Sequence, residues 1–168
     1  MIYYTIIGGV EMKYAVDNIY DIAKWFLHTE PMTHKKLQKL LYFSYGIYLA
    51  QNNESCNNLK NALFKNNFEA WVHGPVDPDI YHLFKHHGVN LIGIEQTEKF
   101  DFSFEVFSAL SKTMELYGEY SADELENITH NQLPWENARK GLSFIQSSSN
   151  PLLDKDIFTT FRNDLLNE

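Results

Sequence analysis

The chain has 168 residues, 44% of them hydrophobic, and its 14 Lys and Arg against 22 Asp and Glu give a formal net charge of −8. This length suits one domain with a buried core, and the single cysteine excludes an internal disulfide framework and fits a reducing cytoplasm. The acidic balance disfavours nucleic acid as a partner, because such binding needs clustered basic residues, and it favours a basic protein surface.

Residues 1–11 (MIYYTIIGGVE) differ in character from the rest of the chain, and we interpret them as an N-terminal extension of a domain over residues 12–168. The apolar run Ile2–Ile7 is far short of the ~20 residues that span a bilayer, and no basic segment precedes it as in a secretory signal. Two interpretations stay open. Either Met12 is the native start and opens a helical pattern, or Ile2–Ile7 is an edge strand.

Two helices are predicted next. Apolar residues at positions 16, 19, 23, 26 and 27 recur at helical spacing and predict a helix over residues 15–29, ended by Pro31. Thr33 is a favourable N-cap for a second helix over residues 34–51. Its apolar stripe includes Leu37, Leu40 and Leu41, whereas the only basic cluster of the chain is expected on its solvent-facing side: Lys35, Lys36 and Lys39. The Asn-rich residues 52–67 predict a loop.

A short strand and a helix come after this loop. The aromatic-rich segment Phe68–Val72 is the best strand candidate, and Asp77-Pro78 is typical of a helix start, here predicted to run over residues 78–87. The composition of residues 88–102 predicts irregular structure, with a short strand at Leu91–Ile94.

The last third of the chain predicts four helices. The first covers residues 104–117, and a capping box at Ser121–Glu124 starts the second, over residues 122–129. Pro134 opens a third, which Gly141 closes, and Asp154 is expected to cap a fourth over residues 155–166. The expected fold is therefore mainly α, a compact single domain of about six to seven helices, with a minor β element near Phe68–Val72.

Histidines offer the only candidates for metal or catalytic chemistry. His82 and His86 lie four residues apart on one predicted helix, with Asp79 as the only nearby third ligand. We favour a polar helix end over a metal site there. His34, His73 and His130 fall at element boundaries, where a histidine acts as a general base or bridges backbone groups at turns. We favour the second interpretation, because no catalytic signature surrounds them or Cys56. We therefore predict no enzyme, cofactor or metal.

Three blocks in order carry the most specific signal. The first is KLQKLLYFSYG at residues 36–46, continuing to Ala50, and the second is FEAWVHGPVDP at residues 68–78, continuing to Tyr81. The third combines Tyr117-Gly118, SADEL at residues 121–125, Thr129-His130 and Pro134-Trp135. Together, over about residues 12–141, they resemble the Panacea antitoxin domain, also called SocA-like and related to phage-associated GepA proteins.

The resemblance implies an antitoxin of a bacterial or prophage toxin–antitoxin pair, which neutralises a protein toxin encoded nearby by direct binding. It implies no catalytic activity. One member of the family instead delivers its toxin to a cytoplasmic protease, so an adaptor role is the main alternative. A small hydrolase that uses His73, His130 or the pair His82 and His86 is a weaker one.

We expect the partner-binding residues to lie in the second and third blocks. The side chains of five residues on or next to turns are expected to line a shared groove: Trp71, His73, Tyr81, His130 and Trp135. Gly74 and Pro75 are expected to shape the turn between the strand and the next helix. An alternative for Trp71 and Trp135 is that they are core residues that close helix–strand junctions, which are common positions for large aromatic side chains.

Overall fold

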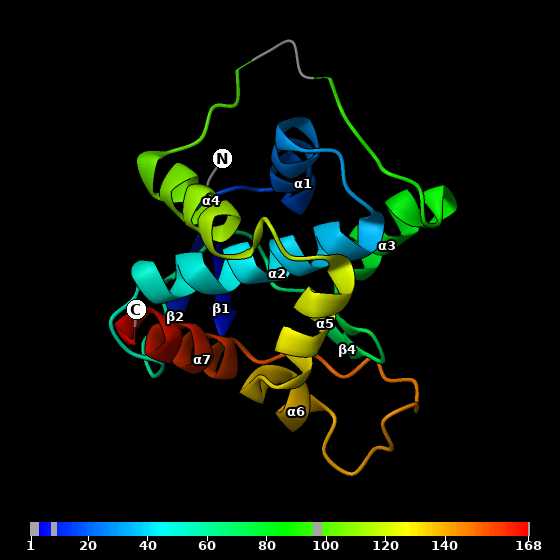
Figure 1. Cartoon of the computed structure of the whole chain (residues 1–168). Helices are drawn as coiled ribbons and strands as arrows, with labels where there is room; N and C mark the ends of the chain where they lie inside the picture. The colour runs from blue at the N-terminus through cyan, green and yellow to red at the C-terminus, as the bar shows by residue number, and fades with distance from the viewer. Residues whose placement is uncertain (1–3, 8–9, 96–98, 168) are drawn as a thin grey trace.

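The computed structural model describes residues 4–7, 10–95 and 99–167, and it is mainly helical with two small sheets (Figure 1). The helices are α1 (Ile19–Thr29), α2 (His34–Gln51), α3 (Pro78–Phe84), α4 (Phe104–Tyr117), α5 (Ala122–His130), α6 (Leu133–Ala138) and α7 (Asp154–Leu166), with a 3₁₀ turn at Lys85–His87. The strands are β1 (Tyr4–Ile7), β2 (Val10–Tyr14), β3 (Asn61–Ala62), β4 (Glu69–Trp71) and β5 (Gly74–Val76). The expected mainly α fold with a minor β element is confirmed.

Helix α2 is the centre of the molecule. It crosses the middle of Figure 1, and helices α1, α3, α4, α5 and α7 all contact it. Every residue from Leu37 to Ala50 is buried, so this helix is covered on all sides. Aromatic rings fill the space around it, as where Phe43 stacks on Tyr117 with ring centroids 3.9 Å apart. Burial of such rings supplies most of the favourable free energy of a core of this kind.

The expectation that Lys39 faces solvent is wrong. Its side chain is only 1% exposed, whereas Lys35 and Lys36 are partly exposed. The physical reason is the surroundings of α2, because a helix covered on all sides leaves no solvent-facing stripe for a basic residue in its middle.

The N-terminal residues form strands and not the start of a helix. β1 pairs antiparallel with β2, and β2 pairs in parallel with β3 through Lys13–Asn61 and Tyr14–Ala62. Met12 lies within β2, so the helical pattern expected from this residue is wrong. Helix α1 begins only at Ile19, because the Asn18 side chain accepts a hydrogen bond from the Tyr20 backbone N–H. Residues 2 and 3 of the expected strand lie outside the described residues.

Most of the predicted helix starts are confirmed. Thr33 and Asp77 cap α2 and α3, and Ser121 forms the expected capping box with Glu124. Asp154 does not cap α7, however. It is the first residue of the helix, and its carboxylate instead accepts hydrogen bonds from the Tyr45 hydroxyl and the Asn66 amide.

Two expected strands are shorter than predicted. The strand at 68–72 is reduced to β4, which forms an antiparallel hairpin with β5. The strand at 91–94 is reduced to a single bridge, in which Ile92 exchanges both backbone hydrogen bonds with Met32. None of the helices in the described ranges is long and apolar enough to cross a bilayer.

Candidate partner-binding site

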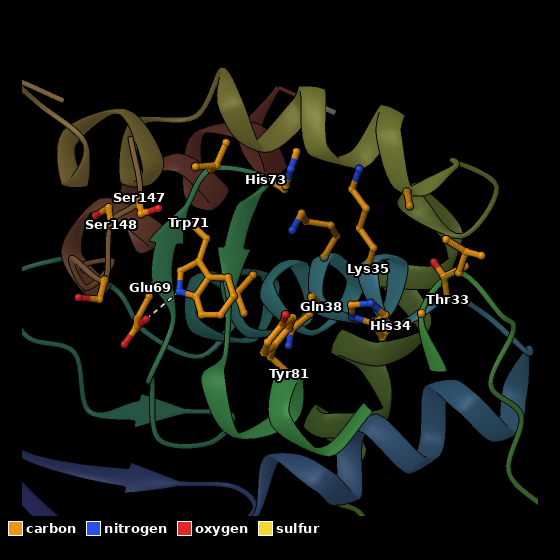
Figure 2. A pocket seen from close by; sticks show the side chains of 17 residues that line it. Thr33, His34, Lys35, Gln38, Glu69, Trp71, His73, Tyr81, Ser147 and Ser148 are labelled. Carbon is orange, nitrogen blue, oxygen red and sulfur yellow. Dashed lines mark hydrogen bonds between the residues drawn. The ribbon is translucent and has the colours of Figure 1, made fainter. Parts of the chain in front are cut away.

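A pocket of about 970 Å³ opens between the N-terminal half of α2, the β4–β5 hairpin and α3 (Figure 2). Residues 147–149, from the Ser-rich link before α7, close one side of it. Such a volume lies at the upper end of the range of ligand pockets, about 300–1,000 Å³. The site therefore offers a preformed hollow that a small ligand or a few side chains of a partner can fill.

One wall of the pocket is aromatic. The Trp71 and Tyr81 rings meet edge to face with centroids 4.8 Å apart, and the His34 ring packs against Tyr81 with centroids 5.9 Å apart. Figure 2 shows the Trp71 indole held by a hydrogen bond from its Nε1 to Glu69 Oε2, 2.7 Å long. Trp71 and Tyr81 are both half-buried. These contacts fix the orientation of the rings while one part of each stays accessible.

The floor of the pocket is polar although it is buried. Gln38 uses its amide twice, since Nε2 donates to the Asp77 carbonyl at 2.9 Å and Oε1 accepts from the Asp77 N–H at 2.8 Å. Lys39 Nζ donates to the Pro75 carbonyl at 3.1 Å. Burial lowers the pKa of Lys39 to about 7, because a low-dielectric environment disfavours the ammonium. Lys39 thus joins α2 to the hairpin, and Gln38 joins it to the cap residue of α3.

Glu126 of α5 organises the rim. Its carboxylate forms an ion pair with Lys35, which also pairs with Asp123, and lies 3.0 Å from His73 Nδ1. Partial burial raises the pKa of Glu126, but hydrogen bonds from Lys35 and His73 outweigh this effect and hold the pKa below its ordinary value. The rim is therefore a network in which a carboxylate from α5 joins a cation of α2 to the turn of the hairpin.

Three side chains bind consecutive carbonyls of β4 and the turn after it. Arg139 donates to the Ala70 carbonyl at 2.8 Å, and Trp135 Nε1 donates to the Trp71 carbonyl at 2.8 Å. His130 Nε2 lies 3.0 Å from the Val72 carbonyl, and because a carbonyl only accepts, Nε2 carries the proton. Burial lowers the pKa of His130. The edge of the hairpin is thus satisfied by side chains of α5 and of the segment around α6, together with a single backbone bridge between Glu69 and Pro151.

The structure divides the seven candidate residues into three groups. The side chains of Trp71, His73 and Tyr81 line the pocket, whereas His130 and Trp135 lie behind the hairpin and contact its backbone. Gly74 and Pro75 form the start of β5. Gly74 has φ +94°, and a Cβ there would lie 2.8 Å from Lys39 Cε and 2.7 Å from Thr129 Oγ1, so this position requires glycine.

The prediction that His130 bridges backbone groups agrees with its contact to Val72, whereas His73 pairs with a carboxylate instead. Trp135 is buried and closes the junction between α6 and the hairpin, as the alternative interpretation expected. His82 and His86 are exposed. Across the described ranges, no three His, Cys, Asp or Glu side chains are grouped so that they could hold a metal ion.

Sequence reasoning missed four residues of this region: Gln38, Lys39, Glu126 and Arg139. A signal for the first two was present, because a helix whose residues are almost all apolar from Leu37 to Ala50 is buried on every side, and polar residues within it must point at partners. For Glu126 and Arg139 the sequence offered none, since their partners Lys35 and Ala70 are distant in the chain.

The three sequence blocks meet at this site. Lys39 from the first block contacts Gly74 and Pro75 from the second, and Thr129 and Trp135 from the third contact the same hairpin. The central helix, the hairpin, α3 and the first residue of α5 thus surround one pocket in a mostly helical domain.

Comparison with known proteins gives the family. The family model described as "Antitoxin SocA-like, Panacea domain" matches residues 37–136, more than half of the chain, so the chain belongs to this family. The match lies within the range over which the sequence blocks predicted it. The chain is similar to Antitoxin SocA of Caulobacter vibrioides (strain NA1000 / CB15N), with 27% identity over 145 residues that cover 79% of this chain and 73% of that protein. No solved structure matches the chain.

Proposed function

We propose that this protein is an antitoxin that neutralises a cognate protein toxin by direct binding, and that the toxin covers the pocket between α2 and the β4–β5 hairpin. The observation that carries the proposal is the convergence of the three blocks within the matched region on this one pocket. A proposed role in binding and not in catalysis accounts for a site built from aromatic rings and backbone contacts.

The pocket wall has the properties of an interface anchor. Trp and Tyr are enriched among the residues that dominate binding energy, and they lose little conformational entropy when they are already held in place. Trp71 is held by Glu69, and Tyr81 is in contact with both Trp71 and His34. The net charge of −8 would speed encounter with a basic toxin, although charge contributes more to association rate and specificity than to affinity.

The test is complex formation with the product of the neighbouring gene. Wild-type protein should rescue growth when the two are co-expressed in the cytoplasm, and the purified proteins should bind. Trp71→Ala and Tyr81→Ala should each weaken binding by about tenfold or more, the range of an anchor residue. The matched control is Phe104→Ala, because Phe104 is 82% exposed and lies outside the pocket.

Two results would contradict the proposal. One is that no complex forms with the product of the neighbouring gene, and the other is that Trp71→Ala and Phe104→Ala weaken binding equally. Circular dichroism of each variant shows whether a loss of binding is a loss of folding. The half-life of the toxin with and without this protein separates sequestration from delivery to a protease, because sequestration leaves the rate of decay unchanged or slower.

A further inference from the structure

Lys39 is a buried amine that no carboxylate contacts in the described part of the chain. In the described part of the chain its ammonium makes one hydrogen bond, to the Pro75 carbonyl, and no ion pair. Its side chain is 1% exposed, yet it lines the pocket. A buried charge is costly unless a group of opposite charge lies beside it. This ammonium therefore has donor capacity left for a ligand that enters the pocket.

The neighbouring groups do not supply that charge. Glu126 acts on Lys39 through space, but its carboxylate is engaged by Lys35 and His73. Both polar atoms of the Gln38 amide are used by the Asp77 backbone. Glu69 accepts from the Trp71 indole. Each of these carboxylates thus has a partner of its own, which leaves Lys39 as the cation that an incoming anion can pair with.

We propose that the Lys39 ammonium receives a carboxylate carried by the toxin, an Asp or Glu side chain or the C-terminus, inserted beside the Trp71–Tyr81 wall. This inference rests on the proposed function and specifies its chemistry. The aromatic wall accommodates the apolar part of the inserted segment, and the ammonium binds its charged end. A basic toxin with one acidic anchor fits both features, because the net charge of −8 attracts the toxin as a whole and Lys39 selects the anchor.

The protonation state of Lys39 should make the affinity for a carboxylate depend on pH. The charged groups that act on Lys39 are Glu126 of α5 and Lys35 of α2. Burial lowers the pKa of His34 and of His130, and Lys39 adds to this effect at both. A bound carboxylate favours the ammonium, so it should raise the pKa of Lys39. By linkage, binding of a carboxylate should weaken as the pH rises above the pKa of the free residue, by about tenfold per pH unit at most.

The first experiment uses indole-3-acetate as the probe and indole-3-acetamide as its neutral isostere. Wild-type protein should bind the acid about tenfold or more tightly than the amide, at concentrations up to about 10 mM, the range of weak ligands. Lys39→Met should reduce the affinity for the acid to that for the amide. Lys60 is an exposed lysine outside the pocket, so Lys60→Met should change neither the affinity for the acid nor that for the amide.

A measurement on the wild-type protein makes the test independent of whether Lys39→Met folds. The pKa of the Lys39 amine, followed by NMR of the side chain, should rise when indole-3-acetate is added and stay constant with the amide. Equal affinity for acid and amide, an unchanged affinity in Lys39→Met, or no detectable binding of the acid would each overturn the inference.

The second experiment uses the toxin itself. Lys39→Met should weaken the complex by about tenfold or more relative to Lys60→Met. If wild type and Lys39→Met bind the toxin equally, the toxin carries no such anchor and this inference fails while the proposed function stands. If the wild-type protein binds no toxin, the proposed function fails, and the indole probes still show whether the pocket accepts a carboxylate.

Discussion

The two ends of α2 lie in regions that are held together by different forces. Its C-terminal half packs against α4 and α7 through rings and aliphatic side chains, with Tyr42 and Phe43 both against Phe161. Its N-terminal half faces the β4–β5 hairpin, where Gln38 and Lys39 bind backbone carbonyls. Non-directional apolar contacts dominate the first region, which has few hydrogen bonds such as that from Tyr45 to Asp154, whereas the second depends on hydrogen bonds of defined geometry.

The difference shows how a short hairpin is kept in a helical domain. A two-stranded hairpin has marginal stability by itself, and its outer edge exposes carbonyls that need donors. Arg139, Trp135 and His130 supply such donors, and the backbone N–H of Leu152 donates to Phe68, so side chains and one short bridge take the place of a third strand. The apolar region provides stability, and the polar region positions the pocket.

Arg139→Met should have the largest effect. Arg139 is 5% exposed and donates to the carbonyls of Ala70, Ser143, Phe144 and Gln146, so the change leaves the buried Ala70 carbonyl without a donor and removes three part-buried hydrogen bonds. We expect a loss of about 3 kcal/mol or more in the free energy of unfolding, measured by urea denaturation. The matched control is Arg162→Met, because the one acceptor found for Arg162 in the described ranges is the Ala50 carbonyl. Equal losses in the two variants would contradict the role given to Arg139.

Gly46→Ala tests the apolar region. A Cβ at Gly46 would overlap the ring of Phe161, which is held between Tyr42 and Phe43 and cannot turn away easily. Overpacking of this kind costs about 1–3 kcal/mol. Phe161→Leu should be less destabilising in the Gly46→Ala background than alone, because it relieves the overlap. If urea denaturation shows that the double variant loses the sum of the two single losses in unfolding free energy, α2 and α7 do not approach as closely as described.

Lys39→Met should change the pH dependence of stability. The pKa of Lys39 is about 7 in the folded protein and near the ordinary value of 10.5 when unfolded. Between these values the unfolded chain binds more protons, so the contribution of Lys39 to stability rises with pH and is least favourable below pH 7.

The methionine variant lacks this titration. Its advantage in unfolding free energy over the wild type should therefore be largest in acid and shrink by up to about 1.4 kcal/mol per pH unit above neutrality. Urea denaturation of both proteins over a pH series measures this difference. A constant difference at all pH values would mean that burial does not lower the pKa of Lys39.

Removal of residues 1–11 should have the smallest effect. In the described residues β1 pairs only with β2, and the pairing of Lys13 and Tyr14 with β3 remains in a chain that begins at Met12. We propose that this shorter chain keeps the fold and the pocket, with a loss of less than about 1 kcal/mol, because the contacts of α2 with the other helices dominate stability. Thermal unfolding of both chains measures the difference. Failure of the shorter chain to fold would place residues 1–11 within the domain.

Local signals in the sequence predicted the structure correctly where neighbours along the chain decide it. The caps at Thr33, Asp77 and Ser121 are examples, because each side chain binds a backbone N–H three residues ahead. Asp154 shows where this reasoning fails. It comes after a Ser-rich link as a cap would, yet its carboxylate is taken by Tyr45 and Asn66, which are 109 and 88 positions away.

The sequence by itself determined the helical content, the order of the helices and the three blocks that identify the family, since these depend on local spacing and composition. Only the tertiary structure decided that Lys39 is buried, that Arg139 binds the hairpin and that Trp71 and Tyr81 share a pocket with His73. The reason is physical. Whether a charge is solvated, paired or left without a counterion depends on residues that are distant in the chain, and folding alone brings them together.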